Sequence, residues 1–185
     1  MGLSDNLPVI AIENGPTETS EESRLLTRLV TVKTDVFELG INPDKGGDIV
    51  QAKLLKYFPN KDDKSKKIEL LSYNEDNYQY FQTGLLSLSG HPEPNHQQAF
   101  LEKDKKLELR EGQEQISTSL VWKIKQDQTN LEVKKSYTFK RGRYDILLTY
   151  DIKNLGTQDY TFVLYNQLVK KDKKEDKVRL IDRIK

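Results

Sequence analysis

The chain has 185 residues, of which 35% are hydrophobic and 32% charged, and its 30 Lys and Arg nearly balance its 29 Asp and Glu. This length predicts one domain, and nine Tyr, six Phe and one Trp are too many aromatic residues for a fully disordered chain. The absence of cysteine excludes a disulfide scaffold, a thiolate metal site and a thiol nucleophile.

The first 23 residues are predicted to be a disordered acidic linker. They contain five acidic residues and no Lys or Arg, and the stretch 15–23 consists of small and polar residues. Such a segment cannot bury enough apolar surface to offset the entropy of ordering. The apolar run 7–12 is far shorter than the roughly 20 residues of a membrane span, and no basic segment precedes it. The sequence as written therefore predicts a soluble chain.

The first half of the domain reads as a series of short strands. Gly46 and Gly47 are predicted to form a turn within residues 42–47, and not a phosphate-binding loop, because the sequence continues as a strand and not as a helix. Residues 58–67 are predicted to be a solvated loop. The strand-like stretches are 29–33, 36–41, 49–57, 68–71, 78–83 and 85–88.

The clearest pattern in the sequence is an alternation of apolar and polar residues that begins at Ile116. It extends to Ile124, resumes at Leu131 after a polar turn, and continues beyond Arg141-Gly142-Arg143, where Gly142 can take the positive φ of a tight hairpin. Three antiparallel strands are therefore expected. The inward residues predicted for the core are Trp122, Tyr137, Phe139, Tyr144, Ile146 and Leu148.

The chain ends with one more predicted strand and a charged tail. Residues 160–165 are apolar on both faces, which predicts a central strand. Residues 170–185 contain eight basic and four acidic residues, and this mixture favours a solvated loop or a short helix over a nucleic-acid surface. The helix-like spacing belongs to Val178, Leu180, Ile181 and Ile184. The folded domain is thus predicted to span residues 24–169.

These short strands, separated by turns at intervals of about 8–12 residues, predict an all-β antiparallel sandwich or barrel. No long helical period occurs in the sequence. The buried aromatic positions are expected to pack in a core, and not to serve as a stacking platform for bases or sugars.

The sequence offers few candidates for catalysis or metal binding. His91 and His96, with Glu93 between them, lie in a proline-rich stretch whose spacing fits neither a helix face nor a strand face, so no metal site is predicted. There is no P-loop, no GxGxxG and no GxSxG motif. We expect no catalytic residue and no cofactor.

Four motifs taken together resemble the large periplasmic domain of the YidC family of bacterial membrane protein insertases. These are RLVTVKTDV at 28–36, GGDI at 46–49, the Gln51-Ala52 pair that follows, and FKRGRYDI at 139–146. The resemblance covers about residues 24–169. Each motif is weak alone, but their order and spacing correspond to the family.

The resemblance implies an antiparallel β-supersandwich of galactose-mutarotase-like topology on the periplasmic face of a Gram-negative inner membrane. In that family, membrane insertion is carried by five transmembrane helices with a hydrophilic groove and a functional arginine, and none of these has a counterpart here. The resemblance therefore implies a non-catalytic domain that assists insertion and folding through contacts with Sec translocon subunits and nascent membrane proteins. No partner-binding residue can be carried over from the family.

The sequence also departs from the family, because a family domain would continue with more strands after Gln167. We expect a sandwich that is incomplete at its C-terminus, either because the gene is truncated or disrupted or because the given sequence is part of a longer protein. Its uncovered strand edge and apolar face would then be covered by the tail, by a partner chain or by self-association, of which we favour the last two. The apolar residues of that face are Tyr160, Phe162, Val163 and Leu164.

Two other functions remain open at this point. One is a mutarotase-like carbohydrate-binding or epimerising protein, which needs a histidine acid and a carboxylate base in one pocket. The other is a general β-sandwich interaction protein, because alternation alone supports nothing more specific.

Overall fold

The computed structural model describes residues 28–73, 78–88, 92–126 and 128–171. The predicted linker 1–23, His91, and the predicted helix near the C-terminus lie outside these ranges. Within them the chain folds into two β-sheets, and the prediction of an all-β sandwich is confirmed.

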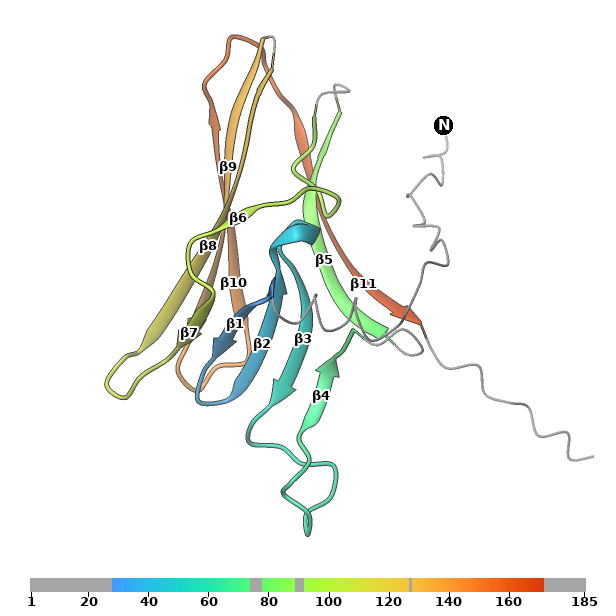
Figure 1. Cartoon of the computed structure of the whole chain (residues 1–185), viewed down its shortest axis with the longest axis vertical. Helices are drawn as coiled ribbons and strands as arrows, with labels where there is room; N and C mark the ends of the chain where they lie inside the picture. Colours follow the sequence, from blue (N-terminus) through green and yellow to red (C-terminus); the bar gives the residue numbers. More distant parts are fainter. Residues whose placement is uncertain (1–27, 74–77, 89–91, 127, 172–185) are drawn as a thin grey trace, which may run out of the picture.

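The larger sheet has seven strands, drawn mainly in blue, green and red in Figure 1. Its order is β11-β5-β3-β2-β1-β7, with β4 paired beside β3. All pairs are antiparallel except β1 with β7. The bounds are β1 Val30–Lys33, β2 Phe37–Asn42, β3 Asp48–Leu54, β4 Ile68–Leu71, β5 Tyr78–Ser87, β7 Lys106–Glu108 and β11 Phe162–Lys171.

The smaller sheet has four strands in the order β10-β9-β8-β6. Its three long strands form an antiparallel meander, and the register runs without a bulge from Gln115 opposite Lys140 to Gln126 opposite Thr129. The β9–β10 turn contains Gly142 at φ +68°, a conformation that glycine adopts without steric cost. The bounds are β6 Leu101–Glu102, β8 Gln115–Gln126, β9 Thr129–Lys140 and β10 Ile146–Asn154.

The turn before β3 begins with the 3-10 helix η1 (Pro43–Lys45), which the Asn42 side chain caps by accepting the Asp44 N–H at 3.0 Å. Gly46 and Gly47 follow with φ of +62° and +77°, and β3 starts at the next residue. Gly46 also lies against the loop 92–98, because a Cβ placed there would meet the Asn95 carbonyl oxygen at 2.5 Å. This position therefore requires glycine for both its backbone conformation and its packing.

The core lies between the two sheets, where β1, β2 and β3 face β8 and β9. The Phe37 and Phe139 rings meet edge to face with centroids 5.9 Å apart. Trp122, Tyr137 and Phe139 are buried, whereas Ile146 and Leu148 are half-buried against the same cluster.

The prediction that Tyr144 is a core residue is wrong. Tyr144 precedes β10, is 42% exposed, and packs on the surface against Tyr57 with ring centroids 5.9 Å apart. The alternation of apolar and polar residues continues through the hairpin to Tyr144, but the strand begins only at Ile146.

The last strand also differs from its prediction. β11 lies at the edge of the larger sheet and pairs with β5 alone among the described strands, so it is not central. Apolar residues on both faces show that the side chains of a strand can be buried on both sides of the sheet. They do not show whether a second strand pairs with its backbone. The strand also continues to Lys171, beyond the predicted boundary at residue 169.

Three further differences concern short or adjoining elements. β6 and β7 were not predicted, because they have two and three residues and are defined by their pairing partners. Residues 78–83 and 85–88, predicted as separate stretches, belong mostly to the single strand β5.

Candidate interaction site

One side of the sandwich is formed by the outermost strands of both sheets, β10 and β11, which the segment 155–161 connects. Each of them pairs with a single neighbour within the described ranges, β9 for β10 and β5 for β11. The opposite edge of each strand presents backbone N–H and C=O groups without a strand partner there. We call this part of the molecule the open side.

The register shows which face of β11 looks toward the other sheet. Leu164 and Leu168 pair with Leu85 and Phe81, and cross-strand partners lie on the same face of a sheet. Thr83, on that face of β5, has its hydroxyl 3.2 Å from the hydroxyl of Tyr150 on β10. Leu164 and Leu168 thus point toward the interior side of the sandwich.

These inward-pointing leucines are nevertheless exposed, Leu164 by 52% and Leu168 by 59%. Ile152, near the end of β10, is exposed as well. By contrast, Phe81 and Phe162 are partly buried against the core. The open side therefore combines free strand edges with apolar side chains that no described segment covers, a combination typical of interaction surfaces.

The other face of β5 and β11 is covered by the loop 92–98. The backbone N–H of His96 donates to the Tyr165 hydroxyl at 3.0 Å, and that hydroxyl lies 2.5 Å from His96 Nδ1. Burial lowers the pKa of His96, assisted by the positive charges of Lys45 and Lys135, so the imidazole is held neutral. Burial also raises the pKa of Tyr165 to about 12.

Glu93, considered above with the histidines as a metal ligand, instead stabilises this loop through hydrogen bonds. Its carboxylate accepts the Ser87 N–H at 2.9 Å and the Asn95 side-chain amide at 3.0 Å. Among the described residues no group of three His, Asp or Glu side chains could hold a metal ion. His96 and Glu93 thus take part in the structure of the loop.

A charged side chain lies fully buried between the sheets. Lys135, in the middle of β9, donates from Nζ to the Gly46 carbonyl at 2.7 Å and to the Thr83 carbonyl at 2.9 Å. The ammonium also lies over the Tyr150 ring, 5.7 Å from its centroid. Beside it, the Tyr137 hydroxyl donates to the Gly47 carbonyl at 2.5 Å. One strand of the smaller sheet is thereby tied to a turn and a strand of the larger sheet.

Asp48 supplies the opposite charge to Lys135 and is itself buried. Burial raises the pKa of Asp48 and lowers the pKa of Lys135, because each charge has lost its hydration. The attraction between the two charges opposes both shifts. Neither residue reaches the surface, and burial outweighs the mutual attraction in both pKa shifts, so the attraction offsets only part of the desolvation cost of the two charges.

Lys135 is the important residue that the sequence analysis did not identify. The inner face of β9 was assigned from Leu131, Val133, Tyr137 and Phe139, and position 135 belongs to the same alternation. A lysine at an inward position within an otherwise apolar set is the signal of a buried charge.

Comparison with known proteins gives one family. The family model described as YidC periplasmic domain matches residues 29–181. A protein named Membrane protein insertase YidC from Pseudomonas entomophila (strain L48) is 30% identical over 176 residues, which are 95% of this chain and 30% of that protein. The protein of the same name from Pseudomonas putida (strain W619) is 32% identical over 169 residues, 90% of this chain and 29% of the relative.

A third relative with this name, from Coxiella burnetii (strain RSA 493 / Nine Mile phase I), is 33% identical over 144 residues, 78% of this chain and 24% of the relative. The chain thus spans less than a third of the length of the curated relatives it matches. Within the described ranges, none of the helical structure has the length and apolar character required to cross a bilayer.

Proposed function

We infer the function from one premise: this chain belongs to the YidC periplasmic domain family, whose model covers residues 29–181. The resemblance seen in the sequence motifs is thereby confirmed. From this membership we propose that the chain acts as the periplasmic part of a membrane protein insertase, at the outer face of the bacterial inner membrane.

In this proposal the domain assists insertion and folding by binding partner segments, and it carries out no chemistry itself. The candidate partners are nascent inner-membrane proteins and subunits of the Sec translocon. The observation that carries the proposal is the open side, where β10 and β11 each have an edge without a partner among the described strands and Leu164 and Leu168 are exposed beside them.

The physical basis is strand addition. A free edge offers hydrogen bonds to any extended backbone, while neighbouring apolar side chains favour apolar residues in the added segment. Because backbone hydrogen bonds do not depend on sequence, such a surface suits partners that share apolar character and differ in sequence. Nascent membrane proteins before insertion have this property.

Among the described residues, His96 and the buried Asp48 and Lys135 lie within the fold and away from an accessible pocket. Lys135 donates hydrogen bonds to two carbonyls, and the His96 ring and the Tyr165 hydroxyl are hydrogen-bonded to each other. Asp48 is buried with Lys135. These contacts support a binding role over the mutarotase-like alternative, which requires a histidine and a carboxylate together in an accessible pocket.

Site-specific photocrosslinking in cells tests the proposal in the complete insertase at its normal expression level. A photoreactive residue at Leu168 should capture Sec subunits or nascent membrane proteins. The matched control is the exposed Lys106 on β7, at the opposite end of the strand order of the larger sheet from β11, which should capture far less. Equal capture at the two positions, or capture of only a second copy of the chain at Leu168, would contradict the proposed partners.

A further inference from the structure

Four chain connections, none of them used in the proposed function, lie together at the lower end of the sandwich in Figure 1. They are the turn 34–36, the loop 55–67, the turn 109–114 and the turn 141–145. The Asp35 carboxylate accepts the Gly142 N–H at 2.9 Å and the Lys56 Nζ at 3.2 Å. The Arg141 guanidinium donates to the Gln113 carbonyl at 2.9 Å. These bonds join all four connections, and we call the region the turn end.

A row of aromatic rings runs from the core to the surface of the turn end. Phe139 contacts Phe37 in the core, and the Tyr144 ring follows with its centroid 6.5 Å from that of Phe37. The Tyr57 ring comes next, 5.9 Å from that of Tyr144, and Tyr57 is 53% exposed. The two tyrosines are thus held in place from the inside while their outer surfaces face solvent. Tyrosine is enriched at membrane–water interfaces, because its ring is apolar and its hydroxyl is polar.

The loop 55–67 carries an unbalanced positive charge. It contains five lysines and two aspartates, which give a net charge of +3, whereas the whole chain has a net charge of +1. Lys61, Lys64 and Lys66 are exposed, and none of them forms an ion pair with another described residue. Asp63 is engaged within the loop, where it accepts the Ser65 N–H at 2.9 Å and the Ser65 hydroxyl at 2.5 Å. The charges of the three lysines are therefore available to a partner outside the chain.

The loop is closed at its base and projects from the turn end. Lys67 donates from Nζ to the Leu55 carbonyl at 3.0 Å and lies over the Phe58 ring, 4.1 Å from its centroid. In Figure 1 the loop between β3 and β4 extends beyond the other three connections. The three exposed lysines and Tyr57 therefore occupy one protruding part of the molecule.

The combination of charge and exposed aromatic rings identifies the kind of partner. Lysines on a projecting loop do not form a shaped pocket, so they respond to the density of negative charge and not to the detailed form of a ligand. A bilayer with anionic headgroups attracts each lysine near its surface and also offers an interfacial layer for apolar rings. An acidic polypeptide offers the charge without the apolar layer. The exposed tyrosines therefore favour the bilayer.

We propose that the turn end lies against the surface of an anionic phospholipid bilayer, with Lys61, Lys64 and Lys66 near the headgroups and Tyr57 in the interface. In the cell this inference rests on the proposed function, which puts the domain at the inner membrane. It uses none of the residues of the open side, so a partner can occupy β10 and β11 while the turn end contacts lipid.

Flotation of the full 185-residue chain with lipid vesicles tests the proposal. Vesicles of phosphatidylcholine mixed with phosphatidylglycerol should carry the chain upward, and vesicles of phosphatidylcholine alone should not. Binding should weaken steeply between low salt and about 0.5 M salt, because exposed charges are screened. Soluble polyglutamate represents the alternative partner. Binding to polyglutamate that equals or exceeds vesicle binding would assign the surface to acidic polypeptides and overturn the proposal.

A matched pair of triple variants separates the turn end from general charge attraction. Replacing Lys61, Lys64 and Lys66 together with Gln should weaken vesicle binding about tenfold or more, because each lysine near an anionic surface adds to the attraction.

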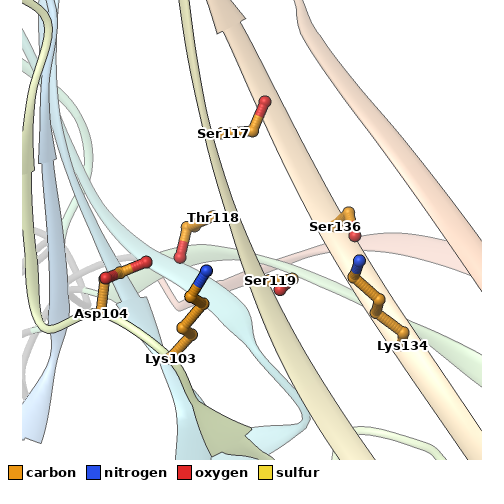
Figure 2. A pocket seen from close by; sticks show the side chains of 7 residues that line it. All are labelled: Lys103, Asp104, Ser117, Thr118, Ser119, Lys134 and Ser136. Carbon is orange, nitrogen blue, oxygen red and sulfur yellow. The ribbon is translucent and has the colours of Figure 1, made fainter.

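The control variant replaces three exposed lysines of the smaller sheet and its crossing segment, Lys103, Lys125 and Lys134, with Gln. Figure 2 shows Lys103 and Lys134 beside a shallow hollow of about 130 Å³, and among the described residues that line it none is aromatic. Both triple variants have the same net charge. The control should change affinity by less than about twofold, because its lysines are not on the projecting loop.

Tyr57→Ser tests the aromatic contribution without changing the charge. It should weaken vesicle binding about fivefold or more and leave the salt dependence unchanged, because the apolar ring is lost from the interface. The matched control is Tyr73→Ser, an exposed tyrosine that follows β4 at its other end from the loop, and it should retain full affinity.

The proposal is overturned if the chain does not float with anionic vesicles at low salt, or if the two triple variants lose affinity equally. It is also overturned if Tyr57→Ser retains full affinity. The melting temperature of each variant separates lost binding from lost folding. This inference and the proposed function fail separately, because flotation uses the chain without any partner protein and the crosslinking at Leu168 reports on the open side.

Discussion

β9 and β11 are long strands that both carry apolar residues on their inward faces, yet they have opposite environments. Every inward residue of β9 from Leu131 to Phe139 is buried, including Lys135. The inward residues Leu164 and Leu168 of β11 are more than half exposed. β9 lies between two strands and opposite β1 to β3, whereas β11 has β5 on one side only within the described ranges. Which face a side chain occupies is therefore a local property, and whether that face is covered depends on distant segments.

The difference teaches that the two regions have separate roles. The closed region around β9 supplies stability through its apolar residues, which are fully covered by the facing strands. The open side contributes less stability and leaves apolar surface for a partner. Substitutions in the two regions should therefore separate stability from binding.

The largest effect is expected at Lys135. Lys135→Met should lower the free energy of unfolding by about 3–5 kcal/mol, because it leaves Asp48 without its opposite charge and two buried carbonyls without their donor. Urea unfolding measures the change. Lys134→Met, one residue away on the exposed outer face, should cost less than about 0.5 kcal/mol.

Adding Asp48→Asn to Lys135→Met should recover part of the lost stability, since the uncompensated carboxylate is then removed. Additive losses in the double variant would show that Asp48 and Lys135 do not interact.

A second contrast compares large apolar residues in the two regions. Trp122→Ala should cost about 3–5 kcal/mol, because the side chain is buried among β8, β9 and the larger sheet. Leu168→Ala on the open side should cost less than about 0.5 kcal/mol. Thermal unfolding followed by circular dichroism compares them, and similar losses would mean that the open side is covered in the folded chain.

Two glycines with positive φ provide a third contrast. Gly142→Ala should cost about 1 kcal/mol, because only backbone strain is added and no atom lies within 4 Å of the new Cβ. Gly46→Ala adds a collision with the Asn95 carbonyl and should cost more than about 2 kcal/mol. Equal unfolding midpoints for the two variants would argue against the packing of the loop 92–98 on the Gly46 turn.

The buried charge cluster predicts a specific pH dependence of stability. Because the pKa of Asp48 is raised in the folded state, the folded protein binds a proton at Asp48 more tightly than the unfolded chain does. The contribution of Asp48 to the free energy of unfolding therefore declines as pH rises from about 4 toward the raised pKa. Because the pKa of Lys135 is lowered in the folded state, the unfolded chain binds a proton at Lys135 more tightly than the folded protein does. The contribution of Lys135 to the free energy of unfolding therefore declines as pH falls from about 10 toward the lowered pKa.

The raised pKa of Asp48 and the lowered pKa of Lys135 both lie at about 7, so the two contributions together predict a stability minimum near pH 7. The variant carrying both Asp48→Asn and Lys135→Met should lack this minimum. Urea midpoints of both proteins across pH measure the difference, and parallel profiles would refute the assigned shifts.

The sequence was sufficient for the elements whose causes are local. Alternation predicted β8, β9 and β10, and Gly142 marked the turn between β9 and β10. Extrapolation failed at Tyr144, where the chain had not yet entered the strand. β6 and β7 are short and are defined by their pairing with strands that are distant in sequence, so the local sequence pattern does not predict them.

The candidate interaction site was only partly predictable, for the same physical reason. The apolar character of residues 160–165 was visible, but their position at a sheet edge depends on which strands are available to pair. The buried charge cluster joins Asp48 and Lys135, which are distant in sequence, and a single strand pattern shows only the lysine.

Hydrogen–deuterium exchange tests the central claim that the open side is where this domain takes a partner. It compares the free chain with the complete insertase during insertion. We predict slow exchange for β9 in both samples, and fast exchange in the free chain, slowed in the working insertase, for the β11 amides that do not bond to β5. Slow exchange of those amides in the free chain, or no change between the two samples, would contradict the account.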